Sequence, residues 1–163
     1  MLKPQIVIVS PLHRAIQTAM LSFADFRTSS TSSIISIPWM AHEGAREQHG
    51  LLQCNKRRSV TDAQLEFPSI DFSAVESNHD VLWQPEARES PTAETERIYD
   101  FLTDFLMARG EDELAVVGHS AWLFTMCNAV VDCGDDAVLK SLFKTSEIRS
   151  MQLSFYRTYS DTE

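Results

Sequence analysis

The start of the chain changes from a strand-like to a helix-like hydrophobic pattern within a few residues. Residues 5–9 form a short, mainly β-branched run, which predicts a buried strand. Apolar side chains then recur at helical spacing, at Leu12, Ala15, Ile16, Ala19, Met20 and Phe23. Between the two patterns, Ser10 suits the N-cap of the helix, and Pro11 suits its first position because an N–H there has no helical partner to lose. The pattern therefore predicts a strand that leads directly into a helix.

The middle of the chain has weaker patterns. Residues 34–37 form a second apolar, β-branched run, and we expect a strand that ends at Pro38. Residues 39–90 mix charges, histidines and scattered apolar positions, with short helices expected around 43–49 and 61–67. We interpret 39–90 as an inserted irregular and helical segment over the functional site, because long connections of this kind often carry function.

The C-terminal half returns to clear patterns. Residues 91–109 carry an apolar stripe and end before a glycine, which predicts a helix, and Leu114–Val117 is typical of a buried strand. We expect further helices over 121–131 and 136–143, and a final strand over 150–156, where apolar residues alternate. Strands separated by helices predict a three-layer α/β/α fold with a mostly parallel sheet and right-handed crossovers.

Composition and charge narrow the class of protein. The 163 residues suit a single domain, and 44% hydrophobic with 23% charged residues is typical of a folded globular chain. A formal net charge of −9 disfavours a surface for nucleic acids or anionic membranes. No apolar stretch approaches a membrane span or a signal-peptide core, and the three cysteines form no Cys-x-x-Cys pair. We therefore expect a cytoplasmic protein with reduced thiols, no metal and no cofactor.

Two of the predicted strands are followed by residues that can carry chemistry. In an open parallel sheet, the ligand crevice lies at the carboxyl ends of the strands. The first strand is followed by Ser10 and then by Arg14 in the first helical turn, a position that favours an anion such as phosphate. Leu114–Val117 is followed by Gly118 and His119. Each signal alone is more often structural, but if the two strands are neighbours, Arg14 and His119 converge on one anion site.

These residues lie within longer motifs. Residues 10–19 read Ser-Pro-Leu-His-Arg-Ala-Ile-Gln-Thr-Ala and resemble the second signature of the histidine phosphatase superfamily, the phosphoglycerate mutase-like proteins. Residues 118–120, Gly-His-Ser, are similar to the distal histidine motif of that family. Residues 46–50 (Arg-Glu-Gln-His-Gly) and 54–59 (Cys-Asn-Lys-Arg-Arg-Ser) resemble the branch that carries a Cys-Asp-Lys-Arg-Arg-Ser stretch, and 147–150 fit its closing strand. The resemblance covers almost the whole chain, in order.

The resemblance implies phosphoryl transfer through a phosphohistidine. In that family a histidine attacks the phosphorus, a carboxylic acid protonates the leaving oxygen, and arginine and histidine side chains hold the phosphoryl oxygens. Carried over by position, Arg14 clamps the phosphate beside Ser10, and His119 is the distal histidine of the phosphate pocket. Glu47 is the leading candidate for the acid, and Glu43 is its rival because the spacing before the following glycine varies in such proteins.

The resemblance also implies a phosphorylated partner, either a small molecule or a phosphoprotein. Arg57 and Arg58 are candidates to attract the rest of such an anionic substrate, although a basic triplet with Lys56 is most often a solvated surface. The chain has no recognisable mutase-type substrate loop, which favours a phosphatase over a mutase. We expect neither a nucleic acid nor a membrane as partner.

The sequence departs from the family pattern at the nucleophile. The family's nucleophilic histidine belongs to an Arg-His-Gly motif that follows an earlier strand, and no Arg-His-Gly occurs in the 163 residues. His13 is a poor substitute, because consecutive helical residues point about 100° apart. We therefore expect an N-terminally truncated domain over 1–163, with its first strand absent and negligible phosphatase turnover. Such a chain is a fragment, an incomplete gene model or a relative that binds without catalysing.

Other classes of function fit less well. Residues 118–122 approach the Gly-x-Ser-x-Gly elbow of a serine esterase with Ser120 as nucleophile, but Trp122 is bulky and no histidine follows the serine. A His-Glu pair at His42 begins like a zinc-protease helix, yet Arg46 stands where the second ligand belongs. The main alternative is a non-catalytic module that binds a phosphorylated molecule at the anion site.

Overall fold

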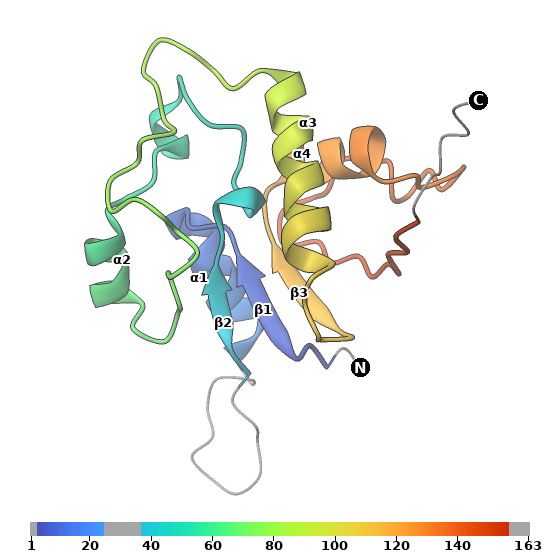
Figure 1. Ribbon diagram of the computed structural model, residues 1–163, viewed down its shortest axis with the longest axis horizontal. Coiled ribbons are helices and arrows are strands. Elements are labelled where there is room, and N and C mark those ends of the chain that lie inside the picture. Colours follow the sequence, from blue (N-terminus) through green and yellow to red (C-terminus); the bar gives the residue numbers. More distant parts are fainter. Residues whose placement is uncertain (1–2, 25–36, 157–163) are drawn as a thin grey trace, which may run out of the picture.

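Three parallel strands form the centre of the molecule. The computed structural model describes residues 3–24 and 37–156. Within these, the strands are β1 (Ile6–Val9), β2 (Trp39–Ala41) and β3 (Leu114–Val117), ordered β2-β1-β3 (Figure 1). The central strand pairs in parallel with both neighbours, with Val7 opposite Trp39 on one side and Ala115 on the other. The parallel α/β arrangement predicted from the alternation of strands and helices is confirmed.

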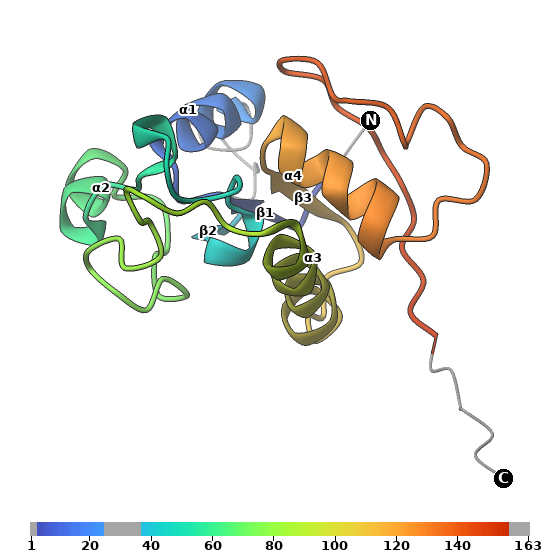
Figure 2. The same cartoon turned by 90° about the horizontal axis from the view of Figure 1, so that it is seen from above.

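Helices cover both faces of the sheet. The α-helices are α1 (His13–Ser22), α2 (Val60–Glu66), α3 (Pro91–Asp100) and α4 (Ser120–Thr125). One hydrophobic cluster joins α1 to Val7 and Val9, and a second joins α3 and α4 to Ile6 and Ile8 on the opposite face. Figure 2 shows α1 and α3 on opposite sides of the strands, so the predicted three layers are confirmed. Across the described residues, no helix has the length and apolar character needed to cross a membrane.

The helices begin at residues that satisfy their first N–H groups. The Ser59 hydroxyl accepts a hydrogen bond from the Asp62 N–H at the start of α2. At the start of α3, the Ser90 hydroxyl accepts from the Ala93 N–H, and Pro91 occupies the first position, where it has no helical bond to lose. The helices predicted in both places are confirmed.

Two helices change geometry toward their ends. α3 continues as a π-helical turn over Phe101–Leu106, and α4 continues in the same way over Met126–Val130, so the helix predicted over 121–131 is present. Around 43–49, only a short 3-10 turn forms, Glu43–Ala45, because the backbone becomes extended at the next residue. The expected short helix is therefore reduced to one turn.

Two expectations about the N-terminal elements are wrong. The N-cap of α1 is Leu12 rather than Ser10, and the helix begins two residues later than expected. The Ser10 hydroxyl bonds the His119 ring at 2.8 Å and accepts from the Leu12 N–H at 3.3 Å, so it caps no N–H group within the helix. Residues 34–36 of the expected second strand lie outside the described part of the chain, and β2 forms after Pro38 rather than before it. The Pro38 carbonyl accepts a hydrogen bond from the Val7 N–H at 3.0 Å, so the proline precedes the strand instead of ending it.

The C-terminal elements differ most from the prediction. Residues 136–143 form turns rather than a helix, because the Asp136 carboxylate binds two of the following backbone N–H groups at 2.9 Å each. Residues 150–156 form no strand, although Met151 and Leu153 still pack against the hydrophobic core. A strand needs a neighbour, and within the described residues β3 pairs only with β1.

Part of the segment 39–90 lies above the carboxyl ends of the strands, whereas α2 lies beside the sheet (Figure 1). In Figure 1 its loops extend beyond the arrowheads of β1 and β2, on the same side as the start of α3. A parallel bridge between Met40 and Asp71 covers the outer edge of β2. Some loops of the segment thus lie at the edge of the sheet where the sequence predicts a ligand site.

Candidate functional site

Ser10 and His119 meet at the carboxyl edge of the sheet. Because β1 and β3 are neighbours, the residues that follow them converge, and the Ser10 N–H donates to the Val117 carbonyl at 2.9 Å. The Ser10 Oγ and the His119 Nε2 are 2.8 Å apart, and both residues are buried. His119 also occupies the N-cap position of α4. The structure therefore brings together two of the residues that the sequence placed at separate strand ends.

The His119 imidazole is held in its neutral form. Burial, and after it the positive charges of Arg14, Arg46 and Arg97, lower its pKa from the ordinary 6.5 to about 3. A neutral imidazole keeps one N–H donor and one acceptor nitrogen. His119 is therefore available to donate a single hydrogen bond without carrying a charge.

Arg14 is anchored by the chain but keeps free donors. It lies in the first turn of α1 and is exposed. Its guanidinium donates to the Cys54 carbonyl and, at 2.9 Å, to the Asn55 Oδ1. Asn55 is itself buried and donates to the Gln48 carbonyl at 2.8 Å. The other N–H groups of Arg14 have no acceptor among the described residues, so this cation is both positioned and open to an anion.

A buried ion pair organises the loop that carries the candidate acids. The Arg46 guanidinium and the Asp80 carboxylate are 2.7 Å apart, and both side chains are fully buried. Burial alone raises the pKa of Asp80, but the hydrogen bonds and charge of Arg46 hold it below its usual value. Arg46 also donates to the Asn55 carbonyl at 2.8 Å, which links this pair to the residue that contacts Arg14.

Arg97 ties the same loop to α3. Its guanidinium makes two 2.7 Å bonds to the Glu89 carboxylate and also donates to the carbonyls of Glu43, Gly44 and Arg46. Burial opposes ionisation of Glu89, but Arg97 and then His49 lower its pKa to about 2. The backbone on both sides of Gly44 is therefore fixed by one charged group.

The two candidate acids have different surroundings. Both oxygens of Glu43 are bound to arginines, one to Arg46 at 3.1 Å and the other to Arg57 at 2.8 Å. Glu47 is half-buried, and its Oε1 accepts from the Gln48 N–H at 3.0 Å. Its second oxygen has no hydrogen-bond partner among the described residues. Of the two, only Glu47 has a carboxyl oxygen that is not already committed to the protein.

Arg57 and Arg58 are engaged by the protein rather than turned to a ligand. Five hydrogen bonds leave the buried Arg57 guanidinium, one to Glu43 and four to backbone carbonyls, so every N–H it has is used. Arg58 is exposed and pairs with Glu66 of α2 at 2.7 Å. The expectation that Arg57 attracts a substrate is therefore corrected: it holds the loop around Asn78 in place.

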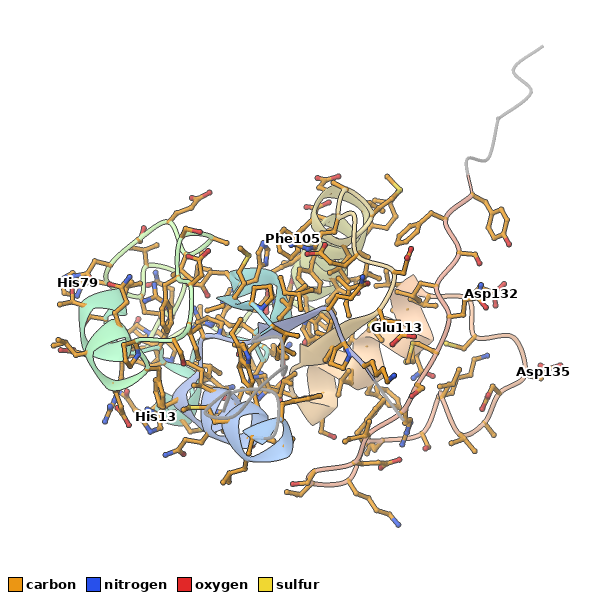
Figure 3. All side chains as sticks on the ribbon, turned by 90° about the horizontal axis from the view of Figure 1, so that it is seen from below. His13, His79, Phe105, Glu113, Asp132 and Asp135 are labelled. Carbon is orange, nitrogen blue, oxygen red and sulfur yellow. The ribbon has the colours of Figure 1, made fainter. Side chains whose placement is uncertain are left out.

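The remaining four histidines are not part of the contact between Ser10 and His119. His13 lies 3.3 Å from Glu66, and His79 is exposed; both lie toward the side of the molecule that carries α2 (Figure 3). His42 accepts from the Gly44 N–H at 2.9 Å, and burial lowers its pKa to about 4. The His49 Nε2 lies 3.0 Å from the Glu89 carboxylate, and we call Arg97, Glu89 and His49 the Arg97 cluster. Within the described residues, no group of histidine, cysteine or acidic side chains is arranged to hold a metal.

The esterase alternative gains no support from the geometry. The Ser120 hydroxyl donates to the Phe143 carbonyl at 2.9 Å, while the His119 ring is bound to Ser10 instead. Ser120 therefore has no histidine base among the described residues, which agrees with the absence of a histidine after it in the sequence.

Sequence reasoning missed the buried ion pair and the Arg97 cluster. Arg46 belongs to the recognised motif but has no local feature that indicates burial, and its partner Asp80 lies 34 residues away. Glu89 and Arg97 are eight residues apart, so neither the period of a helix nor that of a strand points to their pairing. Both pairs can be recognised only from the contacts in the folded structure.

The fold and the site together define an α/β-layered protein with an arginine and a neutral histidine at the carboxyl edge of a parallel sheet. The family model described as "Histidine phosphatase superfamily (branch 1)" matches residues 1–154. The chain therefore belongs to the histidine phosphatase superfamily, as the motifs indicated.

Several curated relatives are longer than this chain. It is 36% identical to a "Phosphoglycerate mutase-like protein" of Arabidopsis thaliana, across 91% of the chain and 63% of that protein. It is 37% identical to "Phosphoglycerate mutase-like protein 1" of the same plant, across 91% of the chain and 60% of the relative. A "Probable phosphoglycerate mutase" of Arthroderma benhamiae is 24% identical across 78% of the chain and 37% of that protein. The chain thus spans about 60% of the length of the two plant relatives, and no solved structure matches it.

Proposed function

We propose that this chain provides the phosphate-binding part of a histidine phosphatase site whose substrate is a phosphomonoester. The observation that carries the proposal is the state of Arg14: two contacts position its guanidinium, and its remaining donors are free. Arginine and phosphate form strong charge-assisted hydrogen bonds, and the first turn of α1 adds the positive end of the helix dipole.

The phosphoryl group is held by two kinds of donor. Arg14 supplies charge, and His119 supplies one hydrogen bond from a ring that burial keeps neutral. The contact with Ser10 fixes the orientation of that ring. Donors fixed before the reaction stabilise the charge that develops on the phosphoryl oxygens, and such stabilisation is usually the largest single contribution to catalysis.

Glu47 is the proton donor in this proposal. When an ester bond to phosphorus breaks, the leaving oxygen takes up a proton, and the free oxygen of Glu47 is suited to supply it. The Arg97 cluster acts as the positioning device, because it fixes the backbone immediately before Glu47.

The covalent step requires a histidine that the 163 residues do not contain in the expected motif. In the family reaction a nitrogen–phosphorus bond forms as the ester bond breaks, and water then cleaves the nitrogen–phosphorus bond. Since no Arg-His-Gly occurs in the sequence, the chain alone binds phosphate with negligible turnover. Hydrolysis of phosphomonoesters is the proposed activity of a protein that combines this site with such a histidine.

The experiment measures phosphate binding and turnover separately. Inorganic phosphate is titrated into the chain, Arg14→Met and Arg58→Met, while backbone amide resonances are recorded by NMR. We expect millimolar or tighter binding that Arg14→Met abolishes, whereas Arg58→Met, which changes an arginine paired with Glu66, retains it. Absence of binding in the unaltered chain overturns the proposal.

A second candidate, the non-catalytic phosphate-binding module, rests on the same site without its nucleophile. Release of p-nitrophenol from p-nitrophenyl phosphate distinguishes the two. Negligible release supports the binding module for this chain, whereas robust release that His119→Ala abolishes shows that the chain is itself a catalyst.

A further inference from the structure

Four large apolar side chains are exposed on two neighbouring turns of the segment above the sheet. They are Leu51, Leu52, Val81 and Leu82, which are 50%, 44%, 62% and 39% exposed, and we call them the apolar rim. The two turns are joined directly, because the Leu51 N–H donates to the Gln84 carbonyl at 2.8 Å and the Trp83 indole donates to the Leu52 carbonyl at 3.0 Å. Single exposed apolar residues are common, but several gathered together usually mark a binding surface.

The apolar rim is connected to Arg14 by a short chain of hydrogen bonds. The Leu52 carbonyl accepts from the Asn55 N–H at 2.9 Å within a 3-10 turn, Gln53–Asn55. The Asn55 side chain in turn accepts from Arg14 at 2.9 Å. One half of the rim is therefore attached to the residue that positions the phosphate-binding arginine.

The other half of the rim is attached to the buried ion pair. The Asp80 carboxylate accepts from the backbone N–H groups of Leu82 and Trp83 at 3.2 and 3.1 Å while it binds Arg46. Both turns are thus fixed to the charged groups that surround the site, and Figure 1 shows their loops beyond the carboxyl ends of the strands. These side chains are therefore exposed on backbone that hydrogen bonds hold in place, and not on a loose loop.

Leu51 has a backbone conformation that leucine rarely adopts. Its φ of 59° lies in the left-handed region, which is unfavourable for a leucine, and it follows Gly50 with a φ of 82°. Such strain persists where the surrounding structure imposes it, and it is concentrated at functional sites. An asparagine or glycine at this position relieves the strain, yet the chain places an exposed apolar side chain here.

The charges next to the rim suit a ligand with an anionic head. The Lys56 ammonium lies 4.6 Å from the ring centre of Trp83, next to the rim, and Arg14 contacts the adjoining turn. We propose that the apolar rim binds the apolar group of a small phosphomonoester whose phosphate lies on Arg14 and His119, so that aryl phosphates are preferred over phosphates of polar alcohols. This assignment of substrate class rests on the proposed function.

The test compares three probes on the full chain. Dissociation constants are measured by NMR titration for inorganic phosphate, phenyl phosphate and glycerol 3-phosphate. We expect phenyl phosphate to bind about tenfold more tightly than the other two, because its ring removes apolar surface from water. The double variant Leu52→Ser/Leu82→Ser abolishes this preference and leaves inorganic phosphate binding unchanged. The control Leu65→Ser changes a leucine that is 79% exposed on α2, and it retains the preference.

The outcomes separate this inference from the proposed function. If phosphate binds but phenyl phosphate and glycerol 3-phosphate bind equally, the rim inference is wrong and the phosphate site stands. If inorganic phosphate does not bind, the proposed function itself is wrong. A phosphotyrosine peptide that binds far more tightly than phenyl phosphate, through the same two leucines, overturns the assignment to small molecules.

Discussion

The His119 imidazole and the Ser10 hydroxyl are 2.8 Å apart, although 109 residues separate them in the chain. The contact joins the carboxyl ends of β1 and β3. The ring is buried, and the positive charges of three arginines act on it, so it is held neutral. The site therefore has an oriented, uncharged donor next to an anchored guanidinium.

Removal of the Ser10 hydroxyl is expected to destabilise the protein. Ser10→Ala leaves the buried ring nitrogen of His119 unpaired, which costs about 1–3 kcal/mol in the free energy of unfolding. Urea denaturation measures the change. Ser120→Ala is the matched control, because Ser120 is an exposed residue whose hydroxyl also makes one hydrogen bond, and we expect a smaller loss. Equal losses for the two variants contradict the importance given to the Ser10 contact.

Replacement of Arg97 tests the clamp on the loop that carries Glu47. Arg97→Met removes the bonds to three backbone carbonyls and leaves Glu89 buried without its arginine, so we expect a loss of about 3–5 kcal/mol. Arg109→Met removes a more exposed pair with Glu111, 2.6 Å apart, and is expected to cost at most about 1 kcal/mol. Thermal or urea unfolding measures both. Similar losses in the two variants argue against a special role for Arg97.

Gly44 is required by the packing of the same loop. A Cβ added at this position lies 2.6 Å from the Phe101 ring, so Gly44→Ala forces a shift in the core and is expected to cost about 1–3 kcal/mol. Gly110→Ala is the control, since no atom lies within 4 Å of the added Cβ. Unfolding in urea gives both values. A Gly44→Ala protein as stable as Gly110→Ala shows that this loop packs differently.

A buried and a half-buried histidine, His119 and His42, make the stability of the protein depend on mildly acidic pH. The pKa of His119 is lowered to about 3 and that of His42 to about 4, from an ordinary value of 6.5. Between the lowered pKa values and 6.5, the unfolded chain binds more protons than the folded chain. The free energy of unfolding is therefore highest above about pH 6.5 and decreases as the pH falls below that value. Glu89, with a pKa lowered to about 2 from 4.5, adds to the loss only below about 4.5.

Denaturation in urea at several pH values between about 7 and 4.5 measures this dependence. His119→Gln is expected to show a smaller decline than the unaltered chain, because one of the two groups is removed. The exposed His79 provides the control, and His79→Gln keeps the original decline. If His119→Gln declines as steeply as the unaltered chain, His119 is not buried in its neutral form.

Much of the framework could be predicted from the sequence. The change of period after Val9 indicates a strand that leads into a helix, and the rule that parallel strands end at one edge brings His119 to Ser10. These inferences depend on short-range patterns and on a general property of parallel sheets. The continuous apolar run of β1 also indicates a strand that is covered on both faces, and the whole strand is buried.

The roles of individual charges could not be predicted in the same way. Arg57 belongs to a basic triplet, and nothing local indicates that it is buried and bound to backbone carbonyls 20–22 residues away. Residues 150–156 have the alternation of a strand, but a strand forms only beside a partner, and none is present among the described residues. Both outcomes are decided by tertiary contacts that the linear pattern does not contain.

The most direct test of the account is the titration of the His119 ring by NMR with and without inorganic phosphate. We expect the ring signals of the free protein to show no titration between about pH 5 and 8, because burial and three arginines hold the ring neutral. Added phosphate moves these signals and shifts the pKa upward, since an adjacent anion favours the charged ring. A free-protein midpoint near 6.5, with signals that phosphate leaves unchanged, contradicts the account.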